Sequence, residues 1–269
     1  MIICDDEITE LAKYIKAHYG VNLVGKNSLV RSRLSFEVEK KGFHSLTDYF
    51  KYSLNDKSGQ EFANILNKLT TNYTYFMREA GHFDFLVKTA LGDLEKNVLR
   101  NKDLRIWNAA CSTGEEPYTI AMFVDDYFDY RKNDWDAKIL ATDISEKVLD
   151  ISRKALYDAA SVAKLPALFK EKYIETVDSK HVRICKKIRD EVIFHKFNLL
   201  SSSFSFKKPM HIIFCRNVLI YFDKDTKENV IDKLCNCLER GGYIFFGHSE
   251  PISGHKRLDR VGAAVYKKK

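Results

Sequence analysis

The sequence lacks the features of a membrane-spanning or exported protein. Among its 269 residues, no stretch approaches the ~18 consecutive apolar residues that a transmembrane helix needs. The amino-terminal run MIICDDEITE carries acidic side chains where a secretory signal has a basic region followed by an apolar one. We therefore expect a cytoplasmic protein that does not insert into a membrane.

Cysteine is too sparsely arranged to form a disulfide or zinc framework. The six cysteines include no CxxC pair, and only Cys235 and Cys237 are close together. Two residues apart on a helix, these side chains would point to different faces, which suits neither a disulfide nor a tetrahedral metal site. We expect reduced, mostly buried thiols and no bound metal ion.

A strong excess of charge of one sign is also missing. The 44 Lys and Arg residues against 37 Asp and Glu give a net charge of +7, which is too weak by itself to indicate a nucleic-acid-binding protein. The 45% hydrophobic and 13% aromatic fractions exclude a disordered chain, because they supply apolar surface to offset the chain entropy. We expect a folded protein that meets anionic partners other than nucleic acid.

Two patterns follow one another along the chain. Residues 5–79 show helical periodicity, as in the i, i+3, i+4, i+7 spacing of Ile8, Leu11, Ala12 and Ile15. After about residue 104, short apolar strands alternate with helical segments, and the chain ends in AAVYKKK (263–269), which we place at the edge of a sheet. Such alternation predicts an α/β fold with a doubly wound, largely parallel sheet. We predict a small all-helical domain at 1–78 and the α/β domain at 79–269.

The alternation is interrupted between residues 158 and 196. The segment KHVRICKKI (180–188) alternates in polarity, and we predict that it pairs with DEVIFHKF (190–197) as a hairpin. This hairpin would form a small antiparallel β-subdomain at about 170–196. Its excess of Lys and Arg favours either a solvated face or a docking surface.

The first strand of the second domain ends in a turn, Asn108–Pro117, with unusual chemistry. A dinucleotide-binding turn has the pattern GxGxxG and holds a pyrophosphate at a helix N-terminus. Here only Gly114 is present, followed by Glu115 and Glu116, whose charges repel a pyrophosphate but suit a cation such as the amino group and sulfonium of S-adenosylmethionine. At the end of the next strand, Asp143 is placed to accept hydrogen bonds from both ribose hydroxyls, although an Asp there also suits a helix N-cap.

Six segments carry a pattern that extends over essentially the whole chain: LTTNYTYFMREAGHF (69–83), WNAACSTGEEPYTIAM (107–122), ATDIS (141–145), FNLL (197–200), IIFCRNVLIYFD (212–223) and GGYIFFGHSE (241–250). Together they resemble the chemotaxis-receptor glutamate O-methyltransferase family, CheR. The resemblance implies a class I S-adenosylmethionine-dependent methyltransferase behind the helical domain. It also implies methyl transfer from S-adenosylmethionine to glutamate side chains of chemoreceptors for sensory adaptation, with S-adenosylhomocysteine as the product.

The resemblance assigns roles in the segment that joins the two domains. Residues 71–78 match the family's segment that folds over the cofactor. This implies that Asn72, Thr74 and Arg78 contact S-adenosylmethionine, and that Arg78 is a catalytic residue close to the transferred methyl group. Arg78 could instead pair with a surface acid such as Glu79.

Further cofactor contacts are implied in the second domain. By resemblance, Glu116 holds the methionyl amino group and Asp143 holds the ribose. Asn198 and Leu199 flank the adenine.

The segment after the fourth strand supplies the last candidates. The resemblance implies that Cys215, Arg216 and Asn217 line the far wall of the cofactor site and that Tyr221 is catalytic, facing the methyl group. Tyr221 could instead be a core aromatic residue, and Asn217 could cap the turn after its strand. His248 could be mistaken for a general base, but the implied reaction needs none, which favours a structural role.

The resemblance also implies a protein substrate. The family methylates glutamates on the long cytoplasmic helices of chemoreceptors and binds them through its amino-terminal domain, for which Arg31 and Arg33 are the substrate-binding candidates. Some members also dock a receptor's C-terminal pentapeptide through a hairpin loop that contains glycine. The stretch at 175–192 contains no glycine, which favours a pentapeptide-independent enzyme. We expect a monomer associated with receptor arrays.

Two alternative functions stay open at this point. One is a methyltransferase with a different acceptor, such as nucleic acid or a small molecule; base-methylating enzymes often carry an NPPY-like motif where this sequence has CRNVLIYF. The other is a cofactor-binding signalling module without turnover. The presence of all expected contact residues argues against that loss.

Overall fold

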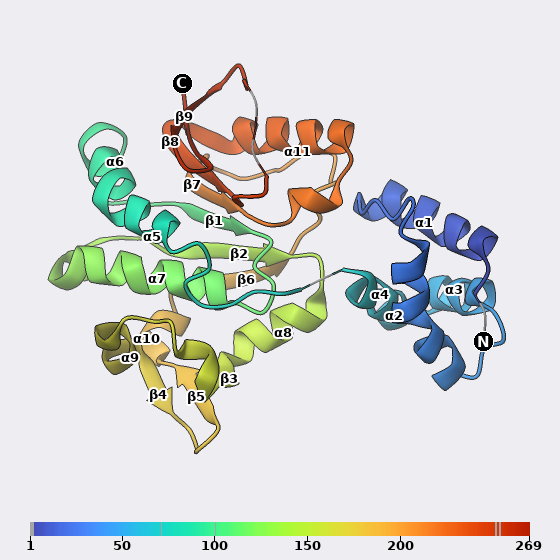
Figure 1. The fold of residues 1–269 in the computed structure, drawn as a ribbon. Helices are drawn as coiled ribbons and strands as arrows, with labels where there is room; N and C mark the ends of the chain where they lie inside the picture. The colour runs from blue at the N-terminus through green and yellow to red at the C-terminus, as the bar shows by residue number, and fades with distance from the viewer. Residues whose placement is uncertain (1–2, 71, 100, 251, 253) are drawn as a thin grey trace. The chain divides into compact units, whose positions relative to one another are not determined.

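The computed structural model describes residues 3–70, 72–99, 101–250, 252 and 254–269, so Thr71 of the linking motif lies outside the described residues. The chain forms two compact units (Figure 1). The first extends to Asn72 and includes a later segment, Tyr221–Lys227; the second contains Tyr73–Ile220 and Glu228–Lys269. None of the described helices is long and apolar enough to cross a membrane.

The first unit is helical, as its periodicity predicts. Its apolar stripe is confirmed, because Ile8, Leu11, Ala12 and Ile15 are all buried. Ser45 caps the third helix by accepting a hydrogen bond from the backbone N–H of Asp48. The later segment joins this unit through Tyr221, whose carbonyl accepts from the N–H of Asn22 at 2.7 Å. The helices are α1 (Asp5–Tyr19), α2 (Asn27–Lys40), α3 (Leu46–Asn55) and α4 (Gln60–Leu69).

The second unit is built on a seven-stranded sheet in the order β6-β2-β1-β7-β8-β10-β9. The first five strands in this order run parallel, and β10 pairs antiparallel with both β8 and β9. The strands are β1 (Ile106–Ala109), β2 (Ile139–Asp143), β6 (Val192–Lys196), β7 (Met210–Cys215), β8 (Leu238–Phe246), β9 (Leu258–Gly262) and β10 (Val265–Lys268). The parallel α/β core predicted from the sequence is therefore present.

The prediction that the C-terminal strand lies at the sheet edge is wrong. Val265 and Tyr266 of β10 are buried because the strand is paired on both sides. The edge is β9, whose residues 259–261 are exposed. The segment before the C-terminal strand was not predicted to be a strand, since its polar residues hide the pattern.

Helices lie beside the sheet, with α7 and α8 packed against β2 and β6, and α6 against β8 (Figure 1). They are α5 (Gly81–Phe85), α6 (Leu91–Asn97), α7 (Glu115–Phe128), α8 (Glu146–Lys154) and α11 (Lys224–Cys237), with a π-helical turn at Leu86–Ala90 between α5 and α6 and 3-10 turns at Asp129–Asp134, Ala159–Val162 and Leu219–Tyr221.

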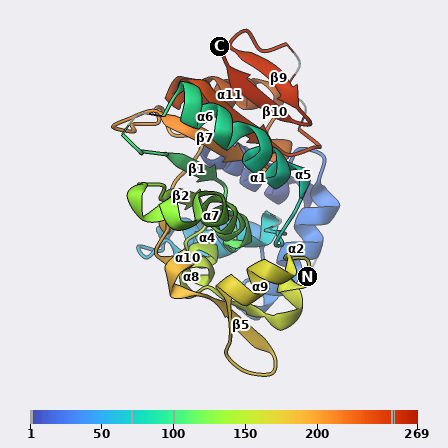
Figure 2. The same cartoon turned by 90° about the vertical axis from the view of Figure 1, so that its left-hand side faces the viewer.

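A separate three-stranded antiparallel sheet has the order β3-β5-β4, and lies apart from the main sheet in both ribbon views (Figures 1 and 2). It contains β3 (Leu156–Asp158), β4 (Ile174–Thr176) and β5 (His181–Ile184), with α9 (Ala167–Tyr173) before β4 and α10 (Lys186–Arg189) after β5. An antiparallel insertion is thus present.

The predicted pairing within this insertion is wrong. β5 pairs with β3 and β4, whereas β6 pairs in parallel with β2 in the main sheet. The short helix α10 separates the two segments, and Phe194 of β6 packs against Tyr118 of α7, with ring centroids 5.7 Å apart. β6 therefore belongs to the main sheet. The alternation of polar and apolar residues within the segment does not reveal which sheet it joins.

The sheet topology sets the position of the site. β1 lies between β2 and β7, and Asn108 of β1 is in register with both Ala141 and Phe214. The chain first builds the sheet outward on one side of β1 and then crosses to the other side at β7. Ligands of doubly wound sheets bind beyond the carboxyl ends of the strands at such a reversal.

Candidate active site

A buried carboxylate, that of Glu116, lies at the C-terminal end of β1. Glu116, in the first turn of α7, accepts a hydrogen bond on Oε1 from Asn108 Nδ2 at 2.7 Å. Its Oε2 accepts from Arg216 Nη1, also at 2.7 Å, from the segment after β7. Burial raises the pKa of Glu116, and the Arg216 guanidinium opposes this shift. A negative group is thus held at the point where strand order reverses.

The turn that carries Glu116 has a constrained backbone. Ala110, Ser112 and Gly114 all have positive φ, of 130°, 48° and 96°. A Cβ atom on Gly114 would lie 2.9 Å from the side chains of Ser152 and Tyr157. Non-glycine residues seldom adopt such φ values except where a functional turn requires them. Glycine at 114 is required both by its φ and by the space around it.

Asp143 lies at the end of β2, on the other side of this turn. Its Oδ2 accepts from the backbone N–H of Ser112 at 2.9 Å, and its Oδ1 from the N–H of Ser145 at 3.0 Å. Burial raises the pKa of Asp143, while these backbone donors lower it. The N-cap of α8 is Ser145, whose Oγ accepts from the N–H of Val148. The alternative of Asp143 as the helix cap is therefore wrong.

Arg216 connects Glu116 to the segment that precedes α5. Its Nη2 donates to the carbonyl oxygen of Arg78 at 2.6 Å and lies 3.1 Å from Glu79 Oε2. Burial raises the pKa of Glu79, but Arg216 and neighbouring hydrogen bonds keep it below its usual value. Glu79, the acid next to Arg78 in the sequence, is thus paired with Arg216. The Arg78 guanidinium donates to the carbonyl of Tyr73 at 2.7 Å and stays partly exposed.

The residues after β7 are held from a second side. Asn217 has φ of 58°, and its backbone N–H donates to Glu250 Oε2 at 2.6 Å. Its side-chain Nδ2 donates to Glu79 Oε1 at 3.3 Å. Cys215 is fully buried, and burial raises the pKa of its thiol. Cys215 is therefore a buried thiol and not a reactive thiolate.

Asn198 and Leu199 lie in the turn after β6, beside the end of β2. The N–H of Phe197 donates to the carbonyl of Asp143 at 2.9 Å, which joins the two strand ends. Asn198 Oδ1 accepts from the N–H of Leu200, and Leu199 is buried. The structure thus brings Glu116, Asp143, Asn198, Leu199, Cys215, Arg216 and Asn217 to one end of the sheet.

The remaining predicted residues are distributed over both units. Thr74 is partly buried in the second unit. Asn72 and Tyr221 belong to the first unit, so their contacts with cofactor or methyl group stay predictions.

The two arginines of α2 also stay predictions as substrate-binding residues. Arg31 donates to the carbonyl of Ile3 and pairs with Asp5. Arg33 donates to the carbonyls of residues 68–70 at the end of α4. Both side chains therefore help to hold the helical unit together.

The sequence did not predict a role in the site for Asn108, Glu79 or Glu250. Asn108 was detectable as the polar residue within a buried apolar strand. Its Oδ1 is buried without a hydrogen-bond partner in the described part of the chain. Such an acceptor, beside a carboxylate and a small-residue turn, fits a polar, positively charged ligand.

Two family models cover nearly the whole chain. Residues 6–70 match "CheR methyltransferase, all-alpha domain", and residues 72–266 match "CheR methyltransferase, SAM binding domain".

Curated relatives match along nearly their full length. The chain is similar to "Chemotaxis protein methyltransferase" of Borreliella burgdorferi, with 39% identity over 99% of this chain and 95% of that one. It is also similar to the protein of that name from Salmonella typhimurium, with 32% identity over 99% and 91% of the two chains. Among solved structures, PKMT2 from Rickettsia typhi aligns with 65% of this chain and 26% of that chain at 15% identity and a TM-score of 0.40, a similarity too weak to support an argument.

The two domain matches fit the observed division into a helical unit and an α/β unit, and the acidic strand-end turn fits the cofactor. The chain belongs to the CheR methyltransferase family and is an S-adenosylmethionine-dependent methyltransferase of that type.

Proposed function

We propose that the enzyme methylates glutamate side chains on the cytoplasmic helices of chemoreceptors and forms methyl esters for sensory adaptation. The full-length similarity to proteins named chemotaxis protein methyltransferase supports this assignment. The observation that carries it is a partly exposed arginine, Arg78, whose own carbonyl is bonded to the buried Arg216–Glu116 pair. A cation next to the cofactor residues is suited to an anionic acceptor.

The chemistry requires alignment more than proton transfer. S-adenosylmethionine supplies a methyl group on a sulfonium, which a carboxylate oxygen takes by in-line displacement. A glutamate side chain with a pKa of about 4.3 is already ionised at neutral pH. The protein therefore needs to orient the carboxylate and exclude water. Arg78 is suited to this task, since a guanidinium donates two parallel hydrogen bonds to a carboxylate.

In this proposal, each cofactor-binding residue contacts a different part of S-adenosylmethionine. Glu116 attracts the methionyl amino group, and Asp143 accepts from the ribose hydroxyls. Asn198 and Leu199 flank the adenine. Asn72, Thr74, Cys215, Arg216 and Asn217 complete the enclosure, and Tyr221 faces the methyl group.

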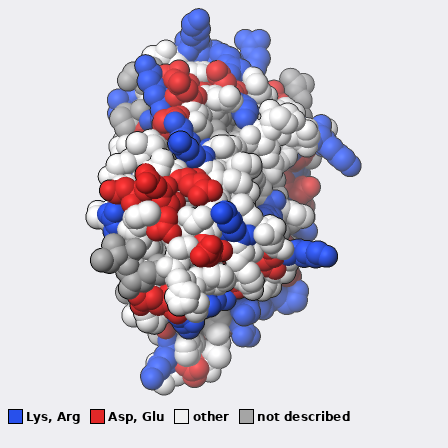
Figure 3. Space-filling view, turned by 90° about the vertical axis from the view of Figure 1, so that its right-hand side faces the viewer, with Lys and Arg blue, Asp and Glu red and all other residues white. Residues whose placement is uncertain are grey.

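The substrate surface is assigned to the helical unit, with Arg31 and Arg33 as its candidates. Charges at α2 are partly compensated by α4: Glu37 of α2 pairs with Lys68, and Lys41, directly after α2, pairs with Glu61. Figure 3 likewise shows Lys and Arg interspersed with Asp and Glu on the face that it draws. A surface of mixed charge does not favour the uniformly negative backbone of a nucleic acid.

We further propose that the enzyme works without a receptor pentapeptide. The loop between β4 and β5 has no glycine, and Asp178 Oδ1 closes it by accepting from the N–H groups of Lys180 and His181 at 2.7 and 2.8 Å. The loop geometry is thus stabilised by a side chain. From the family resemblance we also propose that the enzyme is a monomer and that it associates with receptor arrays.

The test is incubation with methyl-labelled S-adenosylmethionine and chemoreceptor cytoplasmic fragments, followed by mild alkali. Volatile label released by base is the expected result, because it identifies a carboxyl methyl ester. Label that survives alkali identifies a nitrogen or carbon acceptor and overturns the proposal. Cofactor binding without any label, over a broad receptor panel, identifies a module without turnover.

A further inference from the structure

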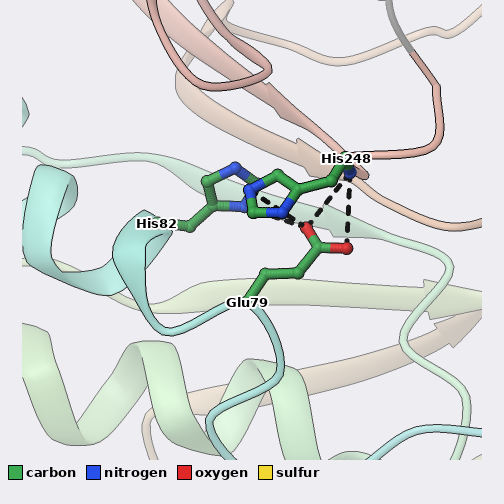
Figure 4. Close-up of side chains that lie close together, drawn as sticks. All are labelled: Glu79, His82 and His248. Carbon is green, nitrogen blue, oxygen red and sulfur yellow. Dashed lines mark hydrogen bonds and ion pairs between the residues drawn. The ribbon is translucent and has the colours of Figure 1, made fainter.

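Three ligand-type side chains converge beside the proposed site (Figure 4). His82 comes from α5, Glu79 precedes that helix, and His248 follows β8. One ligand atom from each lies within 4.8 Å of the others. Glu79 Oε2 is 3.5 Å from His82 Nδ1 and 4.0 Å from His248 Nε2. The proposed methyl transfer assigns no role to either histidine.

The hydrogen bond on the far side of His82 determines its tautomer. His82 Nε2 lies 2.8 Å from the carbonyl oxygen of Ala263. A carbonyl only accepts, so Nε2 carries the proton. In the neutral ring, Nδ1 therefore presents a lone pair.

This lone pair faces a carboxylate. Nδ1 of His82 is buried and has no hydrogen-bond partner within the described residues, and its ring is only 1% exposed. Glu79 Oε2, at 3.5 Å, is also an acceptor. Two acceptors that face each other in a buried place are unfavourable unless a cation or a donor lies between them.

The arrangement is the one that metal-binding histidines adopt. Such a histidine binds the metal through one nitrogen and donates the other N–H to a carbonyl or carboxylate. Tetrahedral ligands about 2.1 Å from zinc lie roughly 3.4 Å from one another, which is close to the separations of 3.5 and 4.0 Å measured here. We propose that Glu79, His82 and His248 form a binding site for a divalent first-row transition metal, with Zn²⁺ as the best match to the two-imidazole, one-carboxylate donor set.

The site is accessible from solvent. The His248 side chain is 51% exposed. With Arg260, Ala263, Ala264 and Tyr266, it lines a pocket of about 240 Å³. An ion can therefore enter from this side and keep one position open to water or to an exogenous ligand.

The surrounding charges limit the affinity. Arg216 lies 3.1 Å from Glu79 Oε2 and opposes a second cation. Glu116 neutralises Arg216, and the buried Glu250, bonded to the N–H of Gly247, adds negative charge on the side of His248. We expect binding weaker than at a dedicated structural zinc site but stronger than at isolated surface histidines.

The first experiment is a titration of the full-length, reduced protein with Co²⁺, followed by visible absorption, and then displacement by Zn²⁺ in calorimetry. We expect one ion per chain, with a four-coordinate spectrum and without a thiolate charge-transfer band. His248→Ala should weaken binding at least ~100-fold, since even changes behind a ligand cost about 10–100-fold. His181→Ala is the matched control, because His181 is partly exposed and pairs with Asp178 at 2.9 Å in a different part of the unit; its affinity should be unchanged.

A second readout does not depend on affinity. Imidazole ¹⁵N NMR should show His82 as the Nε2–H tautomer in the metal-free protein, with the Nδ1 resonance moving on Zn²⁺ addition. Equal binding by wild type and His248→Ala, a thiolate band, no binding at all, or a proton on His82 Nδ1 would each overturn the proposal. All these readouts are independent of methyl transfer.

Discussion

Arg216 Nη1 donates to Glu116 Oε2 over 2.7 Å, and the two side chains are 0% and 10% exposed. The pair joins the first turn of α7 to the segment after β7. A buried charged pair of this kind requires further hydrogen bonds, which Asn108 and the carbonyl of Arg78 provide. The same contacts hold a carboxylate at the point where the ligand's positive groups are expected.

The first prediction concerns that carboxylate. Glu116→Gln removes the negative charge and should weaken S-adenosylmethionine binding by roughly 10–100-fold, because hydrogen bonds to charged groups contribute about 1.5–3 kcal/mol. Glu115→Gln is the matched control, since Glu115 is equally buried but accepts from Thr113. Calorimetry measures both. Equal loss in the two variants would contradict the specific role of Glu116.

The second prediction concerns pH. Burial raises the pKa of both Glu116 and Asp143 above the usual carboxyl range. A cationic ligand favours the ionised form of Glu116, so affinity should fall as pH falls, and the fall should begin above the ordinary pKa of a glutamate side chain. Binding measured between pH 4 and 8 tests this, and Glu116→Gln should flatten the profile. A wild-type affinity independent of pH over this range would exclude the effect.

The third prediction concerns the turn. Gly114→Ala places a Cβ 2.9 Å from Ser152 and Tyr157 at a φ of 96°, and should lower the free energy of unfolding by about 1–3 kcal/mol. Gly92→Ala is its control, because a Cβ there meets Tyr127 Oη at an ordinary 3.6 Å within α6. Denaturant unfolding should show the control unchanged or slightly more stable. A fully stable Gly114→Ala protein would show that the turn tolerates side chains.

The fourth prediction concerns receptor docking. The loop between β4 and β5 is closed by Asp178 in place of a glycine. A peptide with a receptor's C-terminal five residues should therefore give no heat of binding at concentrations that saturate pentapeptide-dependent relatives. Saturable 1:1 binding would show that a glycine-free loop supports docking.

Local patterns in the sequence predicted the parts of this protein whose cause is local. Helical periodicity located α1–α4, and strand ends followed by polar residues located Glu116 and Asp143. Both signals arise within a few neighbouring residues. The family resemblance supplied the remaining candidate site residues, whose roles stay predictions.

The features that the sequence did not predict depend on contacts between residues far apart in the chain. β6 pairs with β2 while the partly buried Phe194 packs against Tyr118, and β10 lies inside the sheet because β9 pairs with its outer side. The Glu79–Arg216 pair connects positions far apart in the chain. The spacing of residue types along the sequence does not indicate these contacts. The return of Tyr221–Lys227 to the helical unit is equally non-local.

The role of Arg78 is tested by the single-turnover rate of base-labile methyl transfer to a chemoreceptor fragment at saturating S-adenosylmethionine, for wild type and Arg78→Ala. If Arg78 orients the acceptor carboxylate, the variant should keep its fold, as circular dichroism will report. Its rate should fall by roughly 100-fold or more, as when one preorganised donor is lost. A rate near that of wild type would contradict the proposed mechanism.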